Sequence, residues 1–151
     1  MGQASRWAGL ITALWAGVLL CIGLIAAPAA FAVLPRHEAG LVAARLFATE
    51  AYVSLALIAL LFVIERQRAR SDASAGKGSV LSTNTLLLLS ALFCTVAGSF
   101  AIPPMMEAAR AGQGAWSFGA LHAASAALFA LKGLLVLALA WRLGFNPAPT
   151  S

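Results

Sequence analysis

Two charged residues lie inside apolar segments, where a charged side chain can bind a cation or exchange a proton. Glu50 is deep in one such segment and Lys132 is deep in another. A carboxylate in a membrane is costly and normally faces a bundle interior or a wet cavity. Glu50 is therefore either a cation or proton site, or an acid that orders helix packing. In either case we expect it to face the bundle, protonated or hydrogen-bonded to another helix.

Lys132 has two alternative roles. Its long stem can extend toward the membrane surface, as single lysines in membrane helices commonly do. Alternatively it pairs with Glu50, although their depths, counted along the segments, differ by roughly 9 Å at about 1.5 Å per residue. That gap is near the reach of two extended side chains, so the sequence leaves the pairing open.

A polar stripe accompanies Lys132. His122, Ser125, Phe129 and Lys132 follow one another at spacings of three, four and three, so they share one face of a helix. A face that carries His, Ser and Lys is unsuited to lipid. The pattern predicts that His122, Ser125 and Lys132 line a polar interior together with Glu50.

Metal and catalytic chemistry have weak support. His37, His122, Glu107 and Met106 are expected near one membrane face, and a thioether among them would suit Cu(I). The alternative is interfacial polar residues with methionine as a gap-filler. No two of these candidates have the spacing of ligands on one helix, so we predict no metal site and no cofactor. No phosphate loop or nucleophile motif is present, and we predict that the chain is not an enzyme.

The elements that hold these residues are membrane spans. The 151 residues are 62% hydrophobic and 10% charged, with a mean hydropathy of +0.91. Soluble domains carry roughly 25% charged residues, so a water-soluble domain is excluded. The net charge of +5 comes from residues clustered at segment ends, which favours anchoring beside anionic lipid over nucleic-acid binding.

Four apolar segments predict an all-α integral membrane protein, a bundle of four transmembrane helices in a single domain. We expect the spans at about 7–34, 40–64, 80–102 and 118–141, with a linker at 71–79 and a disordered tail at 145–151. Arg36-His37-Glu38 is expected to form a polar turn, and Pro103-Pro104 to break the third span. A cleaved signal peptide is the alternative for the first span, but its apolar run exceeds the usual 7–15 residues.

Positive residues predict the orientation. One side of the predicted bundle is richer in basic residues, which are Arg6, Arg66, Arg68, Arg70, Lys77 and Arg142. The richer side is normally cytoplasmic. We therefore expect a multi-pass protein of the cytoplasmic membrane with both termini in the cytoplasm.

One stretch carries a family resemblance. Residues 26–40, AAPAAFAVLPRHEAG, resemble the signature of the transmembrane protein 205-like family, a domain of unknown function (4149) with four spans. The matching positions are Pro28, Phe31, Pro35, Arg36, Ala39 and Gly40, continued by Phe47, Tyr52 and Pro103. Leu121-His122 and Ser125 are similar to a His-x-x-Ser opening of the fourth span. The resemblance implies a four-span membrane fold and no particular activity.

Two functions fit these observations. The first is transport or permeation of a small cation or polar solute through a polar interior lined by Glu50, His122, Ser125 and Lys132. The alternative is a non-catalytic membrane module that binds a partner protein or lipid. The bilayer is the expected environment, with a second copy or another membrane protein as partner, since four helices make a thin bundle.

Overall fold

The chain forms helices throughout the part that the structure describes. The structure, a computed structural model, describes residues 3–74 and 82–145, and within them there is no strand. The elements are α1 (Gln3–Cys21), the π-helix η1 (Ile22–Ala26), α2 (Ala27–Val33), α3 (Arg36–Ser74), α4 (Thr83–Val96), the π-helix η2 (Ala97–Ala101), α5 (Ile102–Arg110) and α6 (Phe118–Phe145). Four stretches of the described residues are long and apolar enough to cross a membrane, which confirms the predicted fold class.

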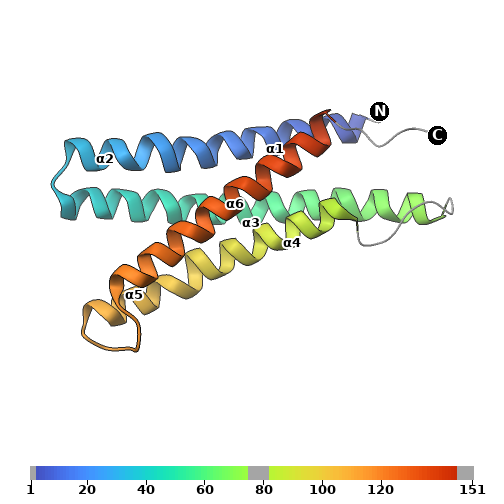
Figure 1. Cartoon of the computed structure of the whole chain (residues 1–151). Helices are drawn as coiled ribbons and strands as arrows, with labels where there is room; N and C mark the ends of the chain where they lie inside the picture. The colour runs from blue at the N-terminus through green and yellow to red at the C-terminus, as the bar shows by residue number, and fades with distance from the viewer. Residues whose placement is uncertain (1–2, 75–81, 146–151) are drawn as a thin grey trace.

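The helices make two hairpins, α1–α3 and α4–α6 (Figure 1). The continuous span α1–η1–α2 runs antiparallel to α3, and α6 crosses obliquely to pack along both α1 and α4. We name the end where α1 begins and α6 ends the Arg142 end, and the end where α3 begins the Arg36 end. Toward the Arg36 end, α3 diverges from α4 and α5 (Figure 1).

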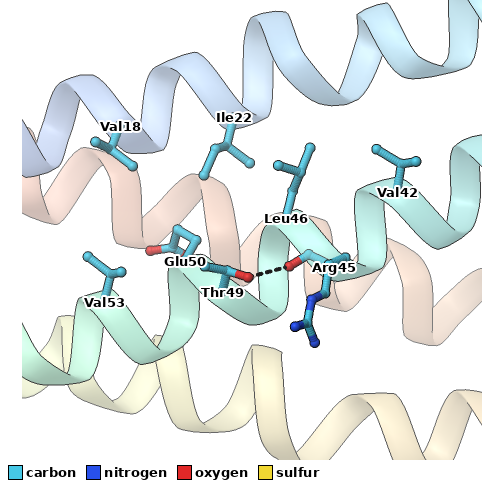
Figure 2. Close-up of a pocket in the computed structure, with 8 residues that line it drawn as sticks. All are labelled: Val18, Ile22, Val42, Arg45, Leu46, Thr49, Glu50 and Val53. Atoms are coloured by element: carbon cyan, nitrogen blue, oxygen red, sulfur yellow. Dashed lines mark hydrogen bonds between the residues drawn. The ribbon is translucent and has the colours of Figure 1, made fainter.

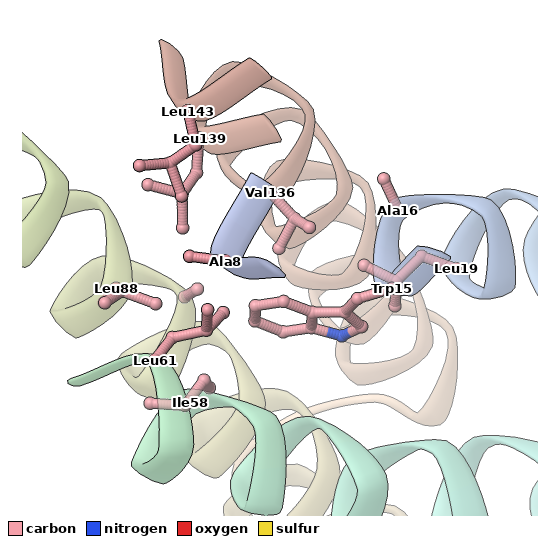
Figure 3. Close-up of a cluster of buried hydrophobic side chains, with 11 residues drawn as sticks. Ala8, Trp15, Ala16, Leu19, Ile58, Leu61, Leu88, Val136, Leu139 and Leu143 are labelled. Carbon is pink, nitrogen blue, oxygen red and sulfur yellow. The ribbon is translucent and has the colours of Figure 1, made fainter. Parts of the chain in front are cut away.

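The apolar core lies between the middle of the bundle and its Arg142 end (Figure 3). Trp15 of α1 packs there with buried leucines and other apolar side chains from α3, α4 and α6. At Gly9, an added Cβ would lie 3.3 Å from the backbone oxygen of Leu143, so α1 and α6 approach closely. Small residues at such crossings allow the van der Waals packing that holds membrane helices together.

Two prolines determine where the π-helices form. Pro28 and Pro103 stand in the first turns of α2 and α5, directly after η1 and η2. A proline ring clashes with the preceding turn of a regular α-helix and has no N–H to donate. The wider π-turn accommodates the ring, so both spans continue past their prolines. The predicted break at Pro103-Pro104 is therefore wrong, and this span extends to Arg110.

Other segments that the sequence placed outside the helices also begin or end within them. Arg36-His37-Glu38 is the first turn of α3 rather than a polar turn, with Glu38 favourably placed near the positive end of the helix dipole. The expected linker begins within α3, which continues to Ser74, and residues 75–79 lie outside the described residues. Of the expected tail, Phe145 ends α6 and residues 146–151 lie outside the described part.

Candidate functional site

An ion pair joins α3 to α6 in the middle of the bundle. The Lys132 Nζ donates to Glu50 Oε2 at 2.7 Å, and each side chain is only 1% exposed. The structure thus answers the question that the sequence left open. A charge pair in this position removes two costly charges from lipid by placing them against each other.

The pair forms because both residues lie at the same depth. Glu50 follows the first residue of α3 by fourteen positions, and Lys132 follows the first residue of α6 by fourteen. Both helices begin at the Arg36 end, so each residue is about 21 Å along its helix at a rise of about 1.5 Å per residue. Starting the second span at Gly40 rather than at Arg36 accounts for about 6 Å of the expected gap of roughly 9 Å, and counting Lys132 from the opposite end of its span accounts for the rest.

A second pair of residues completes a buried polar network. Ser54, one turn after Glu50, donates its hydroxyl hydrogen to Glu50 Oε1. Trp15 of α1 donates its indole N–H to Ser54 Oγ at 2.9 Å. All four side chains are buried, and the network joins α1, α3 and α6. Both carboxylate oxygens therefore accept a hydrogen bond, and each of the four side chains has a partner within the network.

Sequence reasoning missed Trp15 and Ser54. Ser54 carried one usable signal, because it lies four residues after Glu50 and so shares its helix face. Trp15 carried a weaker one, since a buried indole N–H usually finds a partner, but nothing in the chain's pattern indicated which.

Aromatic rings border Lys132 on α6. Its Nζ lies 5.0 Å from the centroid of the Phe129 ring, within the range of a cation–π contact. The Phe129 ring in turn meets the edge of Phe47 from α3, with centroids 4.9 Å apart. An added Cβ at Gly23 would lie 2.9 Å from Phe129, so the π-helix η1 also packs against this ring. The ammonium thus has one carboxylate partner and one aromatic neighbour.

Ser125 bonds a backbone carbonyl instead of joining this network. Its Oγ donates to the Gly98 oxygen at 3.2 Å. In η2 each carbonyl bonds the N–H five residues later, as Ala97 does with Ile102. For Gly98 that position is Pro103, which has no N–H. Ser125 therefore satisfies a carbonyl that the proline leaves without its helical partner.

His122 differs from the prediction. Its side chain is exposed and does not line the interior with Glu50, Ser125 and Lys132. It stacks on Phe118, with ring centroids 6.0 Å apart, and Arg110 lies 4.5 Å from the centre of the same Phe118 ring. The reason is position, because His122 is in the first turns of α6, at the end where the hairpins diverge (Figure 1).

The weak metal candidates are not brought together. His37 and Glu107 are exposed, at the beginning of α3 and in α5. Among the described residues, no group of three or more His, Cys, Asp or Glu side chains is placed to hold a metal ion.

A groove runs between the first span and α3 beside the polar network (Figure 2). Its volume is about 330 Å³, and its lining is mostly hydrocarbon. The lining residues are Val18, Ile22, Val42, Arg45, Leu46, Thr49, Glu50 and Val53. Glu50 backs the groove but is only 2% exposed, whereas Arg45 is exposed.

The residues behind the family resemblance lie mainly where spans turn or meet. Pro28, Phe31, Pro35, Arg36 and Gly40 are near the connection from α2 to α3, and Pro103 follows η2. Tyr52 of α3 meets Phe100 of η2 edge to face, with centroids 5.6 Å apart. Together with Phe47, Tyr52 therefore connects α3 to the second hairpin.

A family model described as "Domain of unknown function (DUF4149)" matches residues 10–115, more than half of the chain. The chain belongs to this family. The matched part includes Trp15, Glu50 and Ser54, whereas Lys132 lies beyond it. No curated protein and no solved structure matches the chain. The DUF4149 resemblance is thus confirmed, and membership of a transmembrane protein 205-like group stays a prediction.

Proposed function

We propose that this multi-pass membrane protein is a non-catalytic module that binds a lipid in the groove between α1 and α3. The observation that carries the proposal is a groove of about 330 Å³ lined by hydrocarbon side chains on a span surface. Ligand pockets span about 300–1,000 Å³, so this one suits a single hydrocarbon chain better than a bulky ligand.

The polar network supports binding over permeation. Glu50, Lys132, Ser54 and Trp15 bond one another, and the exposed His122 does not extend the network toward the Arg36 end. A path for ions needs polar groups that face water along its length. The network joins α1, α3 and α6, and the groove lies on its flank.

The groove can be blocked by one side chain with a matched control. Val53 lines the groove and Val63 does not, and both are exposed on α3. We expect Val53→Trp to remove a lipid that copurifies with the wild-type protein, as counted by native mass spectrometry from mild detergent. Val63→Trp should retain it. Equal lipid occupancy in both variants would refute the groove as a lipid site.

Cation or proton handling by Glu50 is the second candidate. The specific observation in its favour is the Glu50–Lys132 pair, at mid-span beside the groove. Glu50→Gln keeps the side chain's shape and removes the exchangeable charge. Loss of cation or proton flux in reconstituted vesicles, with the protein still folded, would support this candidate. Unchanged flux, or no flux in the wild type, would count against it.

We also propose the cytoplasmic membrane as the location, with both termini in the cytoplasm. The even number of candidate spans among the described residues and the arginines at the Arg142 end support this orientation. In a chain without Cys21 and Cys94, Ala75→Cys should resist an impermeant thiol reagent in intact cells, and Gln113→Cys should react. The opposite labelling pattern would reverse the orientation.

A further inference from the structure

Arg45 is a charged residue without a counter-charge. It lines the groove, its side chain is exposed, and its guanidinium has no hydrogen bond or ion pair with any described residue. It follows the first residue of α3 by nine positions, about 13.5 Å along the helix at a rise of about 1.5 Å per residue. A guanidinium at that depth on a lipid-facing surface is costly unless an anion accompanies it.

The acids of the described chain do not supply that anion. Glu50, the nearest in sequence, already accepts from Lys132 and Ser54. Glu38 shares the face of α3 with Arg45 but is seven residues away, about 10.5 Å by helix rise. Thr49 donates to the backbone oxygen of Arg45, so it does not occupy the guanidinium. Figure 2 shows the guanidinium projecting from α3 on the side away from Val18 and Ile22, apart from the other labelled side chains.

We propose that Arg45 binds the phosphate of an anionic phospholipid whose hydrocarbon chain lies in the groove. This inference rests on the proposed function and adds the chemistry of the ligand. The planar fork of arginine matches phosphate oxygens bidentately, and its long stem can extend toward the headgroup level. Val18, Ile22 and Leu46 supply the apolar wall of the groove, and Arg45 lies at its edge with the guanidinium directed outward.

A phospholipid suits this site better than a free fatty acid. A phosphodiester keeps its charge in an apolar environment, whereas a carboxylic acid readily becomes neutral there. The bilayer also supplies phospholipid at high local concentration on the surface where the groove opens. A fatty acid remains an outcome that the experiment distinguishes.

The test compares phosphatidylglycerol with phosphatidylcholine of identical chains, added to delipidated protein and counted by native mass spectrometry. We expect the wild type to prefer phosphatidylglycerol, and Arg45→Gln to reduce that preference about fivefold. Arg45→Lys should retain part of it. Arg36→Gln is the matched control, because this exposed arginine is on the opposite face of α3 and outside the groove. Melting in detergent checks that each variant is folded.

Each outcome separates the two proposals. Lipid that Val53→Trp removes, with a headgroup preference that Arg45→Gln leaves unchanged, would overturn the Arg45 inference and leave the groove intact. An equal fall in Arg36→Gln and Arg45→Gln would indicate general surface electrostatics and also overturn it. Binding of oleate that depends on Arg45, without binding of phosphatidylglycerol, would replace the phospholipid with a fatty acid. No lipid sensitive to Val53→Trp would defeat the proposed function itself.

Discussion

Two glutamates of α3 make similar bonds in different surroundings. Glu50 accepts from Lys132 and from Ser54, near the middle of the bundle. Glu65 accepts from Arg68 at 2.9 Å and from Asn84 at 3.1 Å, at the Arg142 end. Each glutamate thus has one cationic and one neutral donor, and in each case one donor comes from another helix.

Burial separates the two. Both members of the central pair are 1% exposed, whereas in the other pair the Glu65 side chain is 7% exposed and the Arg68 side chain 28%. Asn84 also accepts from the exposed Arg142 at 3.0 Å, so this second cluster reaches the surface. Water or headgroups can reach the arginines of this second cluster, whereas both charges of the central pair are shielded from them. The two sites should therefore respond very differently to the same kind of substitution.

The largest effect is expected from Lys132→Met. It leaves the Glu50 carboxylate buried without its cation, and breaking a buried pair in this way costs about 3–5 kcal/mol. Unfolding by denaturing detergent in mixed micelles measures the change. Adding Glu50→Gln to the same chain should recover much of the stability, because no unpaired charge remains. A single variant as stable as the wild type would mean that the central pair contributes little.

A smaller effect is expected from Gly23→Ala, which tests the packing beside the pair. The added methyl would lie 2.9 Å from Phe129, and overpacking of this kind costs about 1–3 kcal/mol. Gly17→Ala has no heavy atom within 4 Å of its new Cβ, so it should be neutral or stabilising through helix propensity. Phe129→Leu should relieve the Gly23→Ala defect. Equal stability of the two alanine variants would contradict a tight η1–α6 contact.

Trp15→Phe should have a modest effect. It removes the indole N–H that bonds Ser54 but keeps an aromatic ring in the core. Polar contacts between membrane helices average about 0.6 kcal/mol, with a maximum of about 1.7. Trp7→Phe, at an exposed position, is the control. A cycle with Ser54→Ala isolates the bond, and a coupling energy of zero would remove Trp15 from the network.

The sequence predicted the fold better than the site. The number of spans follows from the number and length of the apolar segments, because few structures other than a helix allow such a segment to cross a membrane. The depth of a residue in the membrane was harder to predict, since an error of four residues in the start of α3 added about 6 Å to the expected gap between Glu50 and Lys132. The π-turns that carry spans past Pro28 and Pro103 leave no signal beyond proline itself. The outward position of His122 depends on how the hairpins diverge, which periodicity within one helix cannot report.

The smallest effect is expected from Asn84→Ala at the other glutamate. It removes the donor to Glu65 and the acceptor for Arg142, but Glu65 keeps the donor Arg68 and the exposed Arg142 keeps access to water or headgroups. Exposed pairs contribute about 0–1 kcal/mol, and salt screens what they do contribute. The cost of Asn84→Ala should therefore be under about 1 kcal/mol and fall as salt rises. The cost of Lys132→Met should not depend on salt, because its pair is shielded from solvent. If Asn84→Ala were as harmful as Lys132→Met, or if both responded equally to salt, the exposure of the cationic partners would not be what distinguishes the two sites.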